Sequence, residues 1–195
     1  MQELIHHTVQ KIKELLEDFN EIQTLYFSKS FDFDSRFDVF LNNVLEYFKT
    51  KGSTSHESEV LKIMNMVSTV KRGFNPIKME KITTGRRDLL WGFSFNGIES
   101  IYDILMEIYT KETKKLDDAE ELISGIIVSL YQNGILDDEK LKELNSVSKI
   151  ESFWTSLVAQ NTAISGVNKK LRLTVIPEDI FLILEEVFLK LILKK

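Results

Sequence analysis

Three histidines are the residues in this chain best suited to bind a metal or to transfer protons: His6, His7 and His56. His6 and His7 are adjacent in a stretch expected to be helical, so their side chains point about 100° apart. No pair of these histidines has a zinc spacing such as HExxH. We therefore expect solvated polar residues near the N-terminus and in a loop, and we predict no metal site and no cofactor.

Carboxylates are the next candidates for chemistry. The spacing of Asp32, Asp34 and Asp38 is similar to that of acidic residues in a calcium-binding loop. The glycine and the terminal glutamate of an EF-hand are missing. The acidic runs DDAEE (117–121) and DDEK (137–140) stand where helices are expected to begin, and the helix dipole favours negative charge there. We interpret all of these residues as helix-capping or solvated groups.

Nucleophile and phosphate-binding motifs are missing from the sequence. The chain has no cysteine, which excludes disulfides, thiolate zinc sites, iron–sulfur ligation and cysteine nucleophiles. There is no GxSxG elbow, and Thr83-Thr84-Gly85 lacks the frame of a phosphate loop. The sequence therefore favours a non-enzymatic protein, with an enzyme of an unrecognised helical family as an alternative.

The segment 71–88 holds the clearest concentration of positive charge, opposed only by Glu80 and Asp88. Arginine forks suit carboxylate and phosphate groups, and aromatic side chains flank the stretch. The alternative is a solvated hairpin whose charges pair with neighbouring acids. We predict a binding surface for an acidic partner or an anion, and its candidate residues are Lys71, Arg72, Lys81, Arg86, Arg87 and Trp91.

The net charge and the N-terminal residues indicate which partners and which compartment to expect. A formal net charge of −5 argues against broad binding of nucleic acid but leaves room for a local basic patch. The N-terminal residues lack a basic start followed by an apolar run, so no secretory signal is expected. We expect a cytoplasmic protein with another protein as its partner, and no membrane partner.

Hydrophobic periodicity predicts a mainly α fold of about seven or eight helices. Apolar residues recur at helical spacing from 3–26 onward, and only two prolines interrupt the chain. The helix over 178–194 is unusually apolar, but it is too short for a membrane span of about 20 apolar residues. We expect it to be the buried centre of a single helical domain, 1–195, with a weak boundary near 52–58. A homodimer through this helix is the alternative.

Two segments have the alternating pattern of strands. Large apolar residues occupy every second position at Leu89, Trp91, Phe93 and Phe95, and again at Ile77 and Met79. This pattern predicts a hairpin over 77–95, with a short helix over 86–93 as the alternative, and the stretch 171–176 could supply a further strand. Alternation usually marks one buried face of a sheet, so we expect these aromatic side chains to be in the core.

Short stretches resemble two known groups of proteins. YFKTKG (47–52) resembles the step that ends the DNA-binding part of tetracycline-repressor-type regulators, but 31–46 lacks that family's glycine turn and basic recognition helix. QNGILDDEKLKEL (132–144) is similar to short helix-turn-helix hairpins, including small C-terminal oligomerisation modules. Neither resemblance assigns a family.

The functional hypothesis is a protein-interaction module of the immunity, antitoxin, adaptor or chaperone-like kind. It depends on the missing catalytic motifs, the acidic balance and the well-capped helices. The alternative is a dimeric regulator that senses a ligand or binds nucleic acid through 71–88.

Overall fold

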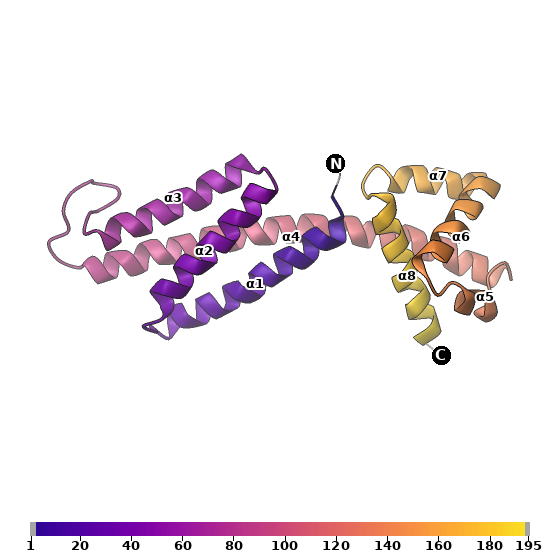
Figure 1. Ribbon diagram of the computed structural model, residues 1–195, viewed down its shortest axis with the longest axis horizontal. Helices are drawn as coiled ribbons and strands as arrows, with labels where there is room; N and C mark the ends of the chain where they lie inside the picture. The colour runs from indigo at the N-terminus through magenta and orange to yellow at the C-terminus, as the bar shows by residue number, and fades with distance from the viewer. Residues whose placement is uncertain (1–2, 194–195) are drawn as a thin grey trace. The chain divides into compact units, whose positions relative to one another are not determined.

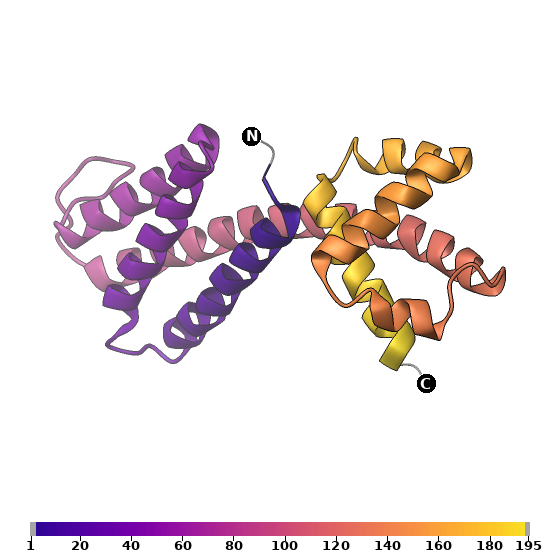
Figure 2. The ribbon, with the colours of Figure 1, turned by 45° about the vertical axis from the view of Figure 1, so that its right-hand side comes forward.

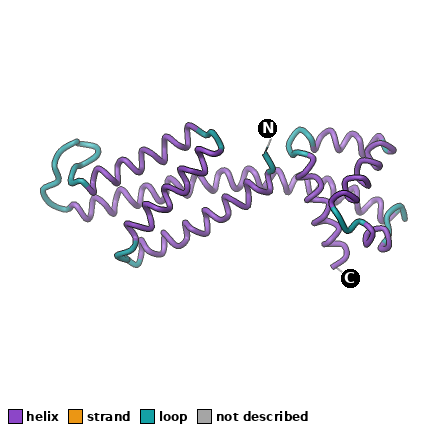
Figure 3. The backbone as a smooth tube through the Cα atoms, in the orientation of Figure 1, coloured by secondary structure: helices purple, strands orange, loops and turns teal. Residues whose placement is uncertain are grey.

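The structure is a computed structural model that describes residues 3–193, and in this range it has eight helices and no strand (Figures 1 and 3). The prediction of a mainly helical fold with seven or eight helices is confirmed. The helices are α1 (Ile5–Phe27), α2 (Phe33–Thr50), α3 (Thr54–Lys71), α4 (Arg86–Gln132), α5 (Asp138–Glu143), α6 (Val147–Gln160), α7 (Thr162–Leu171) and α8 (Pro177–Leu193).

The chain divides into two compact units, each with its own apolar core. The bundle unit is Lys11–Tyr109, and the terminal unit combines the residues up to Gln10 with those from Thr110 onward. Helices α1 and α4 each contribute residues to both units. The polar segment 52–58 lies inside the bundle unit, where Gly52 and Ser53 precede α3 and residues 54–58 are the first residues of that helix. The single-domain interpretation stays a prediction.

The bundle unit is built from α1, α2, α3 and the first part of α4, and α2 and α3 lie side by side (Figures 1 and 2). Helix α2 shows why the segment folds this way. Its buried residues recur at spacings of three and four, which places them on one stripe. Gly52, with a φ of 62°, lies just beyond the end of α2 and permits the sharp turn into α3.

Helices α3 and α4 approach closely at Gly97. A Cβ atom at this position would lie 2.6 Å from Cγ2 of Ile63 and 3.4 Å from Cζ of Phe37. A Cβ atom would therefore force Ile63 to move, whereas Phe37 would stay at an ordinary contact distance. This close approach brings α4 against the core that α2 and α3 share.

The terminal unit contains the apolar C-terminal helix. Ile180, Ile183, Leu184, Val187 and Phe188 of α8 are buried in its core. The expected burial of this helix is therefore found in the terminal unit, while the bundle core contains no residue of α8. Across 3–193, none of the helices is both apolar enough and long enough to pass through a membrane.

The predicted hairpin over 77–95 is wrong. The alternative, a short helix over 86–93, had the right conformation, but residues 86–95 are the first turns of the long helix α4. Residues 77–85 form a loop, in which Lys81 makes an isolated bridge with Phe74. On a helix Trp91 and Phe95 share one face, and Leu89 and Phe93 share another. The alternation therefore arises because two faces of α4 are half-buried.

The predicted strand over 171–176 is also wrong. Leu171 ends α7, and the N–H groups of Thr174 and Val175 both donate to its carbonyl, which makes consecutive turns. Leu171 and Val175 are buried, whereas Leu173 is 81% exposed. Consecutive turns place two of these three apolar residues toward the core here, so the segment does not pair with a neighbouring strand.

Candidate interaction surface on the loop between α3 and α4

The loop 72–85 joins α3 to α4 and is held by its own hydrogen bonds. The side chain of Asn75 accepts from the backbone N–H of Ile77 at 2.9 Å and of Lys78 at 3.1 Å. The N–H of Met79 donates to the carbonyl of Asn75 at 2.8 Å. The backbone φ angle of Met79 is 57°, which is uncommon for a residue other than glycine. These bonds give the loop a defined tip.

Large apolar side chains at this tip are exposed to solvent. Ile77 is 75% exposed and Met79 is 74% exposed, and Phe74 is exposed as well. Three exposed side chains close together in sequence differ from the scattered apolar residues that every protein surface carries. They mark the loop as a candidate contact surface.

Positive charge accompanies these apolar side chains. Lys78, Lys81 and Arg87 are exposed, and no hydrogen bond or ion pair of their side chains is found within the described residues. Arg72 is also exposed, and its Nε donates only to the carbonyl of Ser68, at 3.4 Å. Four cations are therefore available to a partner.

The other three predicted site residues are engaged within the fold. Lys71 makes an ion pair with Asp38 at 2.8 Å. The guanidinium of Arg86 donates to the carbonyls of Val70 and Lys71, which stabilises the end of α3. These contacts hold the base of the loop, so Lys71 and Arg86 position the surface rather than form it.

Trp91, the sixth predicted residue, is half-buried in an aromatic cluster. Its ring centroid lies 4.8 Å from that of Tyr26 and 5.0 Å from that of Phe33. Phe93 and Phe95 are half-buried too, so the aromatic side chains of this stretch lie at the edge of the core.

Sequence reasoning missed Ile77 and Met79 as surface residues because it assigned them to a strand. Their place in the run PIKMEK, directly after Pro76 and on either side of Lys78, was the available signal.

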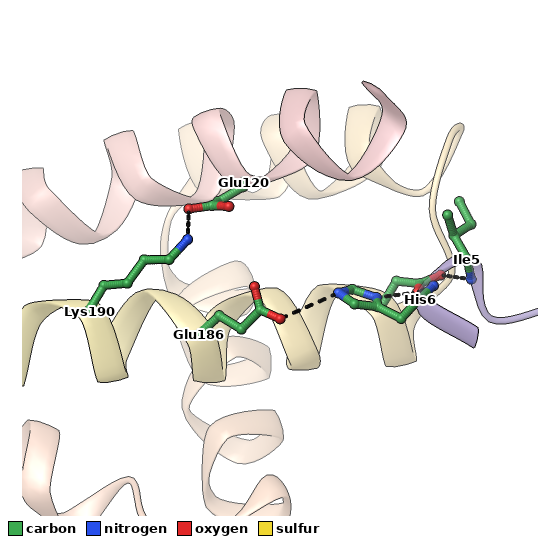
Figure 4. A network of polar contacts seen from close by, with 6 residues as sticks. Ile5, His6, Glu120, Glu186 and Lys190 are labelled. Atoms are coloured by element: carbon green, nitrogen blue, oxygen red, sulfur yellow. Dashed lines mark hydrogen bonds and ion pairs between the residues drawn. The ribbon is translucent and has the colours of Figure 1, made fainter. Parts of the chain in front are cut away.

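A second polar cluster lies in the terminal unit, and Figure 4 shows it around His6. The carboxylate of Asp179 is fully buried and accepts from the backbone N–H of Ile5 and of His6, each at 3.1 Å. Nδ1 of His6 lies 2.7 Å from Oδ1 of Asp179, and its Nε2 lies 3.9 Å from Glu186. The expectation that His6 is simply solvated is wrong, because its side chain is mostly buried against α8.

The environment of Asp179 favours its charged form. Burial raises the pKa of the Asp179 carboxyl, but the hydrogen bonds from the His6 side chain and from the N–H groups of Ile5 and His6 more than offset this, and the pKa is lowered. Two of its three donors are the first N–H groups of α1, so the ionised carboxylate acts as a cap of that helix. The contacts therefore make this His–Asp pair a structural element of the terminal unit.

The two acidic runs, 117–121 and 137–140, have different places in the fold. Asp137 of the run DDEK caps α5 by accepting from the N–H of Lys140 at 2.9 Å, as expected. The run 117–121 lies inside α4 and begins no helix. Within 3–193, no three His, Asp or Glu side chains are close enough to hold a metal ion.

The fold and the loop define an all-α protein with an exposed surface that is both apolar and cationic. Protein-family models, curated proteins and solved structures were compared with the chain, and none matches it significantly. No family is therefore assigned.

Proposed function

We propose that the protein is a non-enzymatic interaction module that binds an acidic partner protein through the loop 72–85 and Arg87. The observation that supports this proposal is the exposure of Ile77 and Met79 beside cations without partners. Protein interfaces combine a desolvated apolar centre with a polar rim, and charge complementarity at the rim selects the partner. An immunity, antitoxin, adaptor or chaperone-like protein of the cytoplasm would use such a surface.

The apolar tip favours a protein over a nucleic acid as the partner. Contacts to phosphates need cations and polar groups, and they gain little from exposed isoleucine and methionine side chains. The net charge of −5 also opposes long-range attraction of nucleic acid. A dimeric regulator that binds nucleic acid is supported only by the four available cations, so it is the second candidate.

The test is site-specific photo-crosslinking in the native lysate. A photoreactive side chain at position 77 should capture one protein of acidic composition, and the same side chain at exposed position 173 should not. Light scattering of the purified pair should then give a defined stoichiometry. Capture of the same proteins from both positions, or recovery of nucleic acid instead, would contradict the proposal.

Charge reversal provides the matched control with the purified partner. The double variant Lys81→Glu, Arg87→Glu should weaken binding at least tenfold and flatten its salt dependence. The variant Lys13→Glu, Lys114→Glu replaces two exposed lysines on α1 and α4 and should bind within about twofold of the unmodified protein. Equal weakening in both variants would show that only net charge matters.

A further inference from the structure

A second surface of the bundle unit has the opposite chemistry to the loop. A groove of about 470 Å³ lies between α1 and α4, and its volume is within the range of roughly 300–1,000 Å³ that is typical of ligand sites. Aromatic side chains from both helices line it: Phe19, Tyr26, Phe27, Phe95 and Tyr102.

The aromatic rings of the groove contact one another, and two of them are open to solvent, whereas Phe19 is buried and Tyr26 and Phe95 are half-buried. The rings of Phe19 and Tyr102 are stacked with centroids 5.0 Å apart, and those of Tyr26 and Phe95 lie 5.7 Å apart. Phe27 is 65% exposed, and Tyr102 is exposed as well. The groove therefore presents aromatic surface that no described residue covers.

Two carboxylates complete the lining of the groove. Glu99 and Asp103 lie one turn apart on α4 and are both exposed. No hydrogen bond or ion pair of either side chain is found across 3–193. Burial raises the pKa of Tyr26, whose hydroxyl donates to the carbonyl of Trp91, so this phenol adds no negative charge to the groove. The acidic side chains of the lining are these two carboxylates.

The spacing of these acids is unfavourable for the helix by itself. Glu99, Asp103 and the exposed Glu107 follow one another at intervals of four residues, and like charges at this spacing repel. Lys111, four residues after Glu107, supplies the opposite charge at that end of the stripe, whereas no cation has this spacing from Glu99 or Asp103. An acidic pair beside an aromatic groove is complementary in charge to a basic side chain.

We propose that this groove binds arginine or lysine side chains of a basic partner protein. A guanidinium or ammonium group over an aromatic face is attracted by the ring quadrupole, and its stem packs on the apolar surface. Glu99 and Asp103 would supply hydrogen-bond acceptors for the charged end. The proposal concerns a different surface from the loop 72–85 and does not depend on it.

The probe is the peptide acetyl-Arg-Ile-Arg-amide, added to the full-length ¹⁵N-labelled protein at low ionic strength. We expect saturable amide shifts concentrated at Gln23 and over 98–103. Acetyl-Glu-Ile-Glu-amide should cause none, because it repels the two carboxylates. Tetramethylammonium chloride, a free organic cation, should cause weaker shifts at the same total ionic strength.

Two variants test the two parts of the site. Glu99→Gln with Asp103→Asn should weaken binding of the arginine peptide about fivefold. Phe27→Leu keeps an apolar side chain but removes the ring, and it should weaken binding about threefold. Both changes are at exposed positions, so the thermal midpoint serves as the check on folding.

A matched control lies further along the same helix. Asp117→Asn with Glu121→Gln makes the same change of charge at the same spacing, outside the groove, and should leave peptide affinity within twofold. Equal weakening by both double variants would overturn the proposal. Tighter binding of tetramethylammonium than of the peptide would also overturn it, because the groove would then suit a free organic cation.

Discussion

The carboxylate of Asp179, in the first turn of α8, accepts the backbone N–H of Ile5, the first residue of α1, at 3.1 Å (Figure 4). The two residues are 174 positions apart in the chain. The first N–H groups of a helix have no partner within the helix, and here a fully buried side chain from another helix satisfies two of them. The first turn of α1 is thereby held against α8 within the terminal unit.

Removing this carboxylate should destabilise the terminal unit. Asp179→Ala leaves two helix N–H groups and the His6 side chain without their acceptor, and we expect a loss of about 2–3 kcal/mol in the free energy of unfolding. Urea denaturation measures the loss, and hydrogen exchange should accelerate at the amides of Ile5 and His6. Glu178→Ala, an exposed change one residue earlier, should cost less than about 0.5 kcal/mol.

The same carboxylate predicts a pH dependence. Because the pKa of Asp179 is lowered in the folded protein, its stabilisation is present above the unfolded pKa of about 3.9 and is lost as the pH falls through the folded pKa. Asp179→Asn should therefore lower the thermal midpoint at about pH 6 and have a smaller effect near pH 2. A difference between the two proteins that stays constant down to that pH would contradict the assignment.

Two glycines of α4 should respond in opposite directions to replacement by alanine. Gly97→Ala places a methyl group 2.6 Å from Cγ2 of Ile63, which is branched next to its own backbone and has little room to move. We expect a net loss of about 1–2 kcal/mol, because overpacking exceeds the roughly 1 kcal/mol that alanine gains in a helix.

Gly92→Ala is the control for this prediction. It lies in the same helix, and nothing is within 4 Å of the added methyl group. Thermal unfolding should show a gain of about 0.5–1 kcal/mol, since only the helix propensity changes. Stabilisation by both substitutions would mean that α3 can shift away from α4 at little cost.

The sequence predicted the helices well where the apolar residues form a single stripe. Residues 3–26 and 178–194 show such a stripe, and α1 and α8 match them within two residues. The pattern was misleading at 86–95, because a helix with two half-buried faces produces the alternation of a strand. It also failed at Thr162–Leu171, where α7 was not predicted although Asn161 caps it through the N–H groups of Ala163 and Ile164.

The predicted site residues stay a prediction, and the sequence did not distinguish the exposed ones from those engaged in the fold. Composition located the cations of 71–88, and three of the six chosen residues turned out to hold the fold together. Which cation is free depends on contacts between α2, α3 and α4, and one sequence does not contain those distances. The groove between α1 and α4 was not predicted at all, since Phe19 and Tyr102 are 83 positions apart and their stacking is a tertiary contact.

Arg86 and Arg87 are adjacent, and the structure assigns them different roles. Arg86 forks onto the carbonyls of Val70 and Lys71, so Arg86→Gln should lower the free energy of unfolding by about 1 kcal/mol. Arg86→Lys should recover only part of this, because an ammonium lacks the planar fork that reaches two carbonyls.

Arg87→Gln should leave stability within about 0.5 kcal/mol, because the Arg87 side chain is exposed and the described residues offer it no partner. Thermal unfolding and partner affinity, measured on the same samples, separate the two roles. Arg87→Gln should weaken binding to the partner captured through the loop, with the thermal midpoint unchanged. If Arg87→Gln instead lowers the midpoint as much as Arg86→Gln, both arginines are structural, and the cationic surface is reduced to Arg72, Lys78 and Lys81.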